Sequence, residues 1–148
     1  MTDLALYEQL MRRCIELGRI AKQRGESPVG AVIVKDDHVI AEGIESGKMH
    51  KDITCHAEIE AIRNAILTSG NTDLSDCFLV TTHEPCIMCS YVIRHHKIKL
   101  VVFGLATREI GGYSSGFPVL STSNISTWAA PPKIIEKVLE QECRNLHE

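Results

Sequence analysis

The sequence predicts an α/β fold in which helices pack on the faces of a central β-sheet. Two observations carry this prediction. Apolar residues recur at helical spacing in several separate segments, and short runs rich in β-branched residues lie between those segments. Their order is helix, strand, strand, helix, strand, helix, strand and a final helix, which favours a sheet covered by helices. The chain has 148 residues, 44% of them hydrophobic, and no repeat or linker, so we expect one domain over residues 1–148.

The first helix is expected from Asp3 to Arg24, because apolar side chains from Leu4 onward follow a helical period. Thr2 or Asp3 could cap its start, and Gly25 could end it. The other expected elements, in chain order, are hairpin strands at 29–34 and 38–41, both largely buried, a polar loop at 43–52, a helix over 54–67, a strand at 77–82, a helix from Pro85 to about His95, a strand at 100–104, a Gly- and Ser-rich loop at 111–124, a short apolar segment at 134–135, and a last helix carrying Val138, Leu139, Cys143 and Leu146.

Charge and cysteine usage exclude several classes of protein. The formal net charge of −3 gives no global attraction for phosphate backbones. No apolar stretch approaches the about 20 residues that span a bilayer, and no signal peptide is visible, so we expect a cytoplasmic protein. Its six cysteines are then expected to be reduced, with Cys14, Cys77 and Cys143 acting as small buried hydrophobic residues.

Two short motifs carry the chemistry: His56-Ala57-Glu58 and Pro85-Cys86-Ile87-Met88-Cys89. A Cys-x-x-Cys at a helix start places both sulfurs on one side of the first turn, where the helix N-terminus stabilises thiolates. His56 could add a nitrogen ligand, and three protein ligands leave the fourth position of a catalytic zinc open. Such a zinc lowers the pKa of its water from about 15.7 toward about 7. Glu58 could then move protons between that water, a ring nitrogen and a departing amine.

The chain resembles the cytidine-deaminase superfamily, whose H-x-E…P-C-x-x-C signature these two motifs match. Within it, the resemblance is to bacterial tRNA adenosine deaminases, guanine deaminases and fungal cytosine deaminases, from about Tyr7 to Cys143. Further matching segments are PVGAVIV at 28–34, VIAEG at 39–43, CHAEIEAIRNA at 55–65, TTHEPCIMC at 81–89, VVFG at 101–104 and VLEQEC at 138–143.

This resemblance implies a three-layer α/β/α sandwich with a mixed five-stranded sheet, and a homodimer. It also implies one zinc per chain, a proton shuttle and two backbone contacts to substrate. The residues that inherit these roles are His56, Cys86 and Cys89 for zinc, Glu58 for proton transfer, the Ala57 N–H for the ring and the Glu84 carbonyl for the leaving amine.

One departure from the family pattern bears on the substrate. Relatives usually place an Asn eleven residues before the zinc histidine, and here that position holds Glu45. An ionised Glu only accepts hydrogen bonds, whereas an Asn also donates them. Glu45 is therefore expected to favour a ring that presents two N–H donors, such as guanine.

Three functions are weighed on these grounds. The first is a zinc-dependent deaminase of guanine or a related free heterocycle, acting in purine metabolism. The alternative is a tRNA adenosine deaminase, which the acidic end of the chain at 136–148 argues against. A local patch of Arg94, His95, His96, Lys97 and Lys99 could still bind phosphates. The third is a non-enzymatic module stabilised by zinc.

Several residues have plainer interpretations. A closed zinc site would take Cys55 or His83 as a fourth ligand. We favour a role for Cys55 as a buried neighbour of the ligand His56, and for His83 a role in the pocket wall or in ordinary packing. The single tryptophan, Trp128, either packs the C-terminal region or stacks on substrate, and packing is favoured. Tyr113 and Phe117 lie in the Gly- and Ser-rich loop, where either one could contact the substrate.

Overall fold

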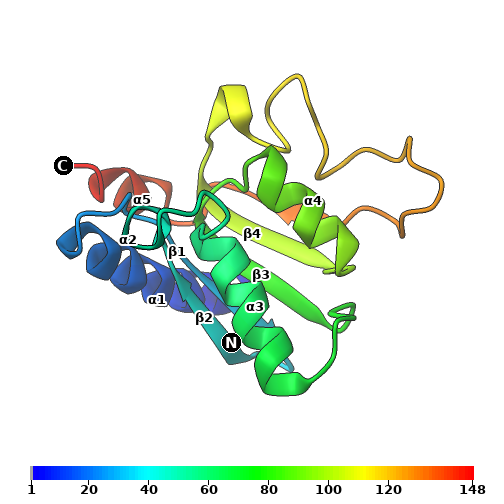
Figure 1. Cartoon of the computed structure of the whole chain (residues 1–148), viewed down its shortest axis with the longest axis horizontal. Helices are drawn as coiled ribbons and strands as arrows, with labels where there is room; N and C mark the ends of the chain where they lie inside the picture. Colours follow the sequence, from blue (N-terminus) through cyan, green and yellow to red (C-terminus); the bar gives the residue numbers. More distant parts are fainter. Residues whose placement is uncertain (1) are drawn as a thin grey trace.

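A computed structural model describes residues 2–148, so residue 1 of the expected domain lies outside it. Five strands form one sheet in the order β2-β1-β3-β4-β5, as Figure 1 shows. The strands are β1 (Gly30–Lys35), β2 (His38–Ile44), β3 (Cys77–His83), β4 (Leu100–Leu105) and β5 (Lys133–Ile135). The helices are α1 (Asp3–Gln23), α2 (Gly47–His50), α3 (Ala57–Ser69), α4 (Ile87–His95), the 3₁₀ helix η1 (Arg108–Ile110) and α5 (Glu140–Asn145).

The sheet is mixed, as the family resemblance predicted. Strand β1 runs antiparallel to both β2 and β3, whereas β3, β4 and β5 are parallel to one another. Parallel neighbours end at the same edge of a sheet, so β3 and β4 deliver the segments that follow them to one place. The expected three-layer α/β/α fold is confirmed.

The helices cover the two faces of the sheet separately (Figure 1). Helices α1 and α5 pack on one face through Met11, Cys14, Val80, Val102 and Cys143. Helices α3 and α4 lie on the other face, over a core of side chains from β1, β3 and β4. The buried cysteines Cys14, Cys77 and Cys143 are free thiols within this packing, as expected.

Strand β2 differs from the expected, largely buried hairpin strand because it forms an edge of the sheet. Its side chains are mostly exposed or half-buried, whereas β1 is buried throughout except at Lys35. Near the end of β2, Gly43 lies against α3, and a Cβ there would overlap the backbone of Ala57 and Ala61. This close approach sets the start of α3 directly beside the end of β2.

The C-terminal segment also departs from expectation. Val138 and Leu139 precede α5 instead of lying on its apolar face. The Val138 amide donates to the Phe103 carbonyl of β4, and Lys137 and Leu139 take positive φ angles of 65° and 51°. The chain bends there to bury Val138 against the sheet, so the helix begins later and is shorter than the apolar pattern suggests.

No helix within residues 2–148 combines the length and the apolar character needed to cross a membrane.

Candidate active site

The three predicted metal ligands converge where α3 and α4 begin. His56 is the residue before α3, Cys86 is the residue before α4, and Cys89 lies in the first turn of α4. The His56 Nδ1 atom lies 3.6 Å from the Cys86 Sγ and 3.4 Å from the Cys89 Sγ. All three ligand atoms lie within 4.8 Å of one another.

These distances fit a tetrahedral zinc. Zinc–sulfur bonds of about 2.3 Å and zinc–nitrogen bonds of about 2.0–2.1 Å place a nitrogen about 3.5 Å from a sulfur across a tetrahedral angle. The two nitrogen–sulfur distances in the structure agree with that value. The donor set of one imidazole and two thiols is also the one that zinc prefers.

The thiols of Cys86 and Cys89 have pKa values shifted in opposite directions. The neighbouring Cys89 thiol, with His56 adding to the effect, lowers the pKa of Cys86 to about 4, while the proximity of Cys86 and burial raise the pKa of Cys89. The backbone amide of Cys89 also donates to the Cys86 Sγ, at 3.5 Å. Metal binding displaces the thiol protons, since thiolate is the form that binds zinc.

Glu58 lies beside the ligands and is almost fully buried, with 4% of its surface exposed. Its Oε1 accepts a 2.7 Å hydrogen bond from the Thr81 hydroxyl of β3, and the Cys89 thiol lies 3.2 Å from its Oε2. Burial raises the pKa of this carboxyl group. The sequence prediction that Glu58 would lie next to the metal ligands agrees with this placement.

Glu45 and Ala57, both expected to contact substrate, contact each other. The Ala57 amide donates to the Glu45 Oε1 at 3.1 Å, across the junction of β2 and α3. Burial raises the pKa of Glu45 to about 7, with smaller opposing contributions from His56 and Glu58. A fraction of these carboxyl groups therefore carries a proton near neutral pH and can donate as well as accept.

Glu84 forms hydrogen bonds within the protein through both its backbone carbonyl and its side-chain carboxylate. Its carbonyl accepts from the Thr107 hydroxyl at 3.2 Å. Glu84 is almost fully buried, with 2% of its surface exposed. Its carboxylate accepts hydrogen bonds from the amides of Thr107, Tyr113 and Ser114 and from the Ser114 hydroxyl. A carbonyl oxygen has two lone pairs, so one remains available to a bound amine.

A pocket of 180 Å³ opens onto this site. It is smaller than the about 300–1,000 Å³ typical of sites for drug-sized ligands, so it suits a single ring system. Its lining residues are Ser27, Val29, Glu45, His56, Glu58, His83, Glu84, Cys86, Thr107 and Ile110.

The alternative of a fourth protein ligand finds no support among residues 2–148. The ring nitrogens of His83 lie 2.7 Å from the Thr82 hydroxyl and 2.7 Å from the His147 Nε2, so both are occupied. The Cys55 thiol lies 3.5 Å from the guanidinium of Arg63. Neither residue joins the three-residue metal group, and His83 instead forms part of the pocket wall.

Arg94 was wrongly placed in a phosphate-binding patch. It is 4% exposed, and its guanidinium donates to the carbonyls of Val119, Thr122 and Ala129. It also lies 4.7 Å from the centre of the Trp128 ring, which confirms the packing role of Trp128. Tyr113 and Phe117 do not appear among the pocket-lining residues.

The pocket residues that the sequence did not reveal come from loops and from the 3₁₀ helix η1. Ser27 and Val29 precede β1, and Thr107 and Ile110 follow β4. A partial signal existed in Thr81-Thr82, two polar residues within a buried apolar strand. Such residues need hydrogen-bond partners, and Thr81 finds one in Glu58.

The fold and the site define a class of protein: a zinc-dependent hydrolytic deaminase. The chain belongs to the cytidine and deoxycytidylate deaminase family, whose zinc-binding region matches residues 5–105. The tRNA-specific adenosine deaminase of Buchnera aphidicola is 37% identical over 140 residues, covering 92% of this chain and 82% of that protein. The protein of the same name from Haemophilus influenzae is 36% identical and covers 92% of this chain and 78% of its own.

Solved structures agree with these relatives. A structure from a study of A-to-I editing by tRNA:A34 deaminases superposes with a TM-score of 0.87 at 31% identity, covering 93% of this chain and 98% of that one. A guanine deaminase from Bacillus subtilis superposes with a TM-score of 0.66 at 37% identity, covering 72% and 66%.

The expectation of guanine or a related free heterocycle as substrate is therefore wrong. Relatives that match nearly the whole chain are tRNA-specific adenosine deaminases, and the guanine deaminase matches less of it. The physical error lies in the treatment of Glu45 as permanently ionised. With its pKa raised to about 7, this residue does not require a ring that only donates.

Proposed function

We propose that this protein converts adenosine to inosine in the anticodon of tRNA. The observation that carries the proposal is the extent of similarity to tRNA-specific adenosine deaminases, which covers 92% of the chain. That extent includes residues beyond the zinc-binding region, which matches residues 5–105.

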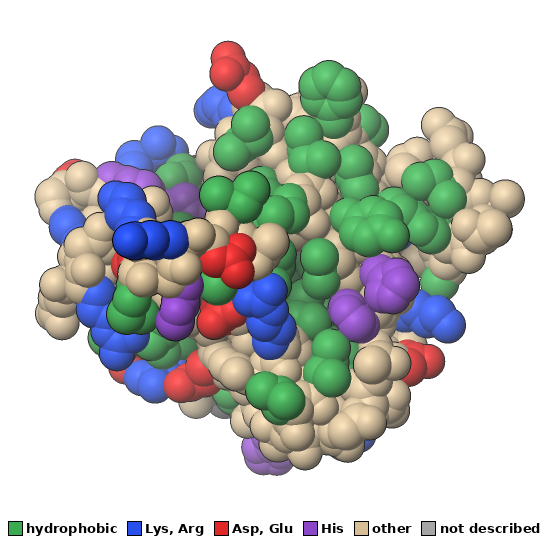
Figure 2. All heavy atoms as spheres, in the orientation of Figure 1, with side chains coloured by type: hydrophobic (Ala, Val, Ile, Leu, Met, Phe, Trp, Pro, Cys, Tyr) green, Lys and Arg blue, Asp and Glu red, His purple; other side chains and the backbone are tan. Residues whose placement is uncertain are grey.

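The size of the pocket and the charges around it support an RNA substrate. A pocket for one ring requires that the base leave its stack, as deaminases acting on nucleic acids require. Next to Glu45, the short helix α2 and its C-cap carry Lys48, His50 and Lys51, and Arg24 lies across a neighbouring groove. Figure 2 shows Lys and Arg side chains gathered over α2. Because phosphate attraction is local, an overall charge of −3 does not oppose it.

The proposed catalytic roles follow from the geometry. His56, Cys86 and Cys89 would hold the zinc, whose chemistry when bound is to activate a water molecule at neutral pH. Glu58 would take a proton from the attacking water and deliver it to N1 of the adenine ring. It would then transfer the second proton to the amine, so that water is consumed, the C6–N bond breaks and ammonia leaves. The raised pKa of Glu58 suits a group that must both accept and release protons.

The proposed substrate contacts are Glu45 and Glu84, and Ala57, expected from the sequence to contact the ring, acts through Glu45 because its single N–H donates to that carboxyl group. A protonated Glu45 would donate to an acceptor nitrogen of the purine while it holds the Ala57 amide. The free lone pair of the Glu84 carbonyl would accept from the leaving amine. These contacts orient a ring that enters beside His56 and Cys86.

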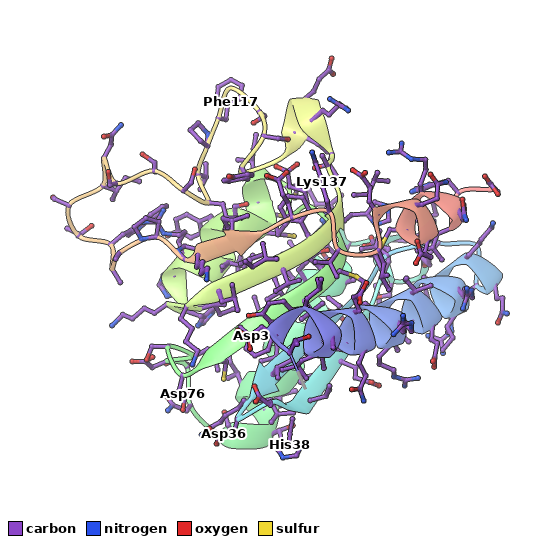
Figure 3. All side chains as sticks on the ribbon, turned by 180° about the vertical axis from the view of Figure 1, so that it is seen from behind. Asp3, Asp36, His38, Asp76, Phe117 and Lys137 are labelled. Atoms are coloured by element: carbon purple, nitrogen blue, oxygen red, sulfur yellow. The ribbon has the colours of Figure 1, made fainter. Side chains whose placement is uncertain are left out.

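A homodimer of this single domain is also part of the proposal. Ile87 and Tyr91 are exposed one turn apart on α4, and Ile53, Ile110 and Phe117 are also exposed. Figure 2 shows hydrophobic side chains gathered over α4 and the adjacent loop, and Figure 3 shows Phe117 at the tip of that loop. A second copy would cover such a face, and a tRNA substrate would place the dimer in the cytoplasm.

The test uses an anticodon stem-loop RNA with adenosine at its first anticodon position. We expect inosine at that position alone, measured by mass spectrometry of the digested RNA, and about 10²–10⁴-fold slower formation of inosine with Glu58→Gln. A stem-loop with guanosine at the same position is the matched control. Release of ammonia from free guanine or adenine, with an unchanged stem-loop, would contradict the proposal.

A further inference from the structure

The segment between β4 and β5 contains only the short helix η1, yet its first part is held by one side chain. The Glu84 Oε1 accepts from the Thr107 amide at 3.0 Å and from the Ser114 hydroxyl at 2.6 Å. Its Oε2 accepts from the Tyr113 amide at 2.9 Å and from the Ser114 amide at 2.7 Å. Four donors therefore converge on a carboxylate that is almost completely buried.

The same segment is also bonded to the backbone beside the metal ligands. The Gly112 amide donates to the Pro85 carbonyl at 2.8 Å, and Gly111 pairs with Cys86 in an isolated β-bridge. A Cβ at Gly111 would overlap the Glu84 carboxylate, so the approach depends on glycine. Residues 107–114 are thus fixed to the stretch that ends in a proposed zinc ligand.

This anchored segment contributes Thr107 and Ile110 to the lining of the active-site pocket, which Glu45 and His56 also line. We propose that the Glu84 carboxylate is a positioning residue for deamination: it sets the distance between this part of the pocket wall and the ligand Cys86. The role goes beyond the proposed function and rests on it only for the substrate used in the assay. It is separate from the carbonyl of Glu84, because it acts through the side chain.

Arg94 supplies a matched control within the same loop. It is buried like Glu84 and holds the more distant part of the loop through the carbonyls of Val119, Thr122 and Ala129. None of these residues lines the pocket. Arg94→Lys therefore weakens the loop without moving the wall at Thr107.

The decisive variant is Glu84→Gln, which keeps the shape of the side chain. The amide nitrogen of Gln cannot accept, so at least one backbone amide among Thr107, Tyr113 and Ser114 loses its partner. Misplacing a reacting group by about 1 Å costs about 100-fold in rate, so we expect kcat/KM to fall about 100-fold, mostly in kcat. Zinc content should remain one per chain. The kcat/KM of Arg94→Lys should stay within about threefold of the wild type, even if this variant loses as much in Tm as Glu84→Gln.

Gly111→Ala provides a second route, because its new Cβ displaces the carboxylate without changing its chemistry. It should show the same fall in kcat at unchanged zinc content. A wild-type kcat in Glu84→Gln, or an equal loss in Arg94→Lys, would overturn the positioning role. If the wild type itself makes no inosine, the proposed function fails separately. In that case the role of Glu84 is tested by hydrogen exchange at the Tyr113 and Ser114 amides, which should lose protection in Glu84→Gln. Unchanged protection of these amides contradicts the inference.

Discussion

Two buried glutamates near the metal ligands have different environments, and this difference separates their roles. Glu84 meets four hydrogen-bond donors and no cation, so its oxygens are fully occupied. Glu58 meets only the Thr81 hydroxyl and the Cys89 thiol, and burial raises its pKa. A carboxyl group that is buried with few donors is suited to carry a proton, whereas a saturated one is suited to hold structure.

Glu58→Gln is expected to retain zinc and lose activity by about 10²–10⁴-fold, because an amide cannot take the proton from water. The measurements are kcat on the stem-loop RNA and zinc per chain by atomic emission. Glu60→Gln is the control, since this neighbour on α3 pairs with Arg63 outside the catalytic pocket. Retention of most activity in Glu58→Gln would show that another group moves the proton.

At Glu45, Gln and Ala should have different effects. Glu45→Gln keeps an acceptor for the Ala57 amide and adds a permanent donor, so we expect kcat/KM within about tenfold of the wild type. Glu45→Ala leaves the Ala57 amide without its partner and should lose about 10–100-fold, since an unsatisfied buried donor costs about 1–3 kcal/mol. Equal activity in the two variants would place Glu45 outside the substrate-binding machinery.

The metal-site residues were predictable because their spacing is local. Cys86 and Cys89 are three residues apart, so the first turn of a helix brings them together, and His56 and Glu58 flank Ala57 at another helix start. The protonation of Glu45 was not predictable, because it depends on burial by segments distant in sequence. The buried state of Arg94 likewise depends on a loop that folds back over α4.

At the scale of elements, the segment that follows α5 is joined to the pocket wall by a pair of histidines, His83 and His147. The His83 Nε2 lies 2.7 Å from the His147 Nε2, and their rings meet edge to face. His83 is the last residue of β3, which is buried throughout, and it is 7% exposed. The C-terminal segment is thereby bonded to a residue that also lines the active-site pocket.

This pair gives the fold a predictable pH dependence. Burial lowers the pKa of His83 from 6.5 to about 4, with repulsion from His147 as the smaller cause. The folded state therefore holds His83 neutral. Its contribution to stability is complete above about pH 6.5 and is lost as the pH falls toward 4. The difference between the two pKa values corresponds to at most about 3 kcal/mol.

His83→Leu should remove this dependence. We expect the Tm of the wild type to fall more steeply than that of His83→Leu between pH 6.5 and 4.5, as measured by calorimetry. His38→Leu is the control, because His38 is exposed on the edge strand β2. Parallel Tm curves for the wild type and His83→Leu would mean that His83 is not held neutral by the fold.

The ends of helices agree with the sequence prediction where a local capping or stop residue is present. Thr2 caps α1 through a hydrogen bond to the Ala5 amide, and Gly70 ends α3 with a positive φ of 70°. The C-terminal helix was overestimated because Val138 is apolar at helical spacing but is buried against β4 from the turn that precedes α5. Periodicity alone cannot distinguish these two ways of burying one residue.

For the whole molecule, the two faces of the sheet differ in what they leave uncovered. The α1 side is closed by α5, whereas α4 on the other side exposes Ile87 and Tyr91. Asp36, His38 and Asp76 lie at the end of the sheet away from the loop that carries Phe117, as Figure 3 shows. The general architecture was predictable from element order, but this asymmetry was not, because exposure depends on which helices meet.

The proposed dimer predicts a change of mass on substitution. Tyr91→Glu should convert a dimer to a monomer, as measured by light scattering after gel filtration, because a charge would be buried in the interface. Leu4→Glu is the control, since Leu4 is exposed on α1 across the sheet. A monomeric wild type at micromolar concentration would refute the dimer.

The two helix starts that supply the metal ligands have a consequence for the unfolded chain. His56 and Cys86 are 86 − 56 = 30 residues apart, so a zinc ion bound to both would close a loop of that length. In the chain-entropy model for cross-links, closing such a loop is worth about 3–4 kcal/mol. The ion would thus act as a reversible cross-link between the starts of α3 and α4, and a chelator would lower the free energy of unfolding as well as stop turnover.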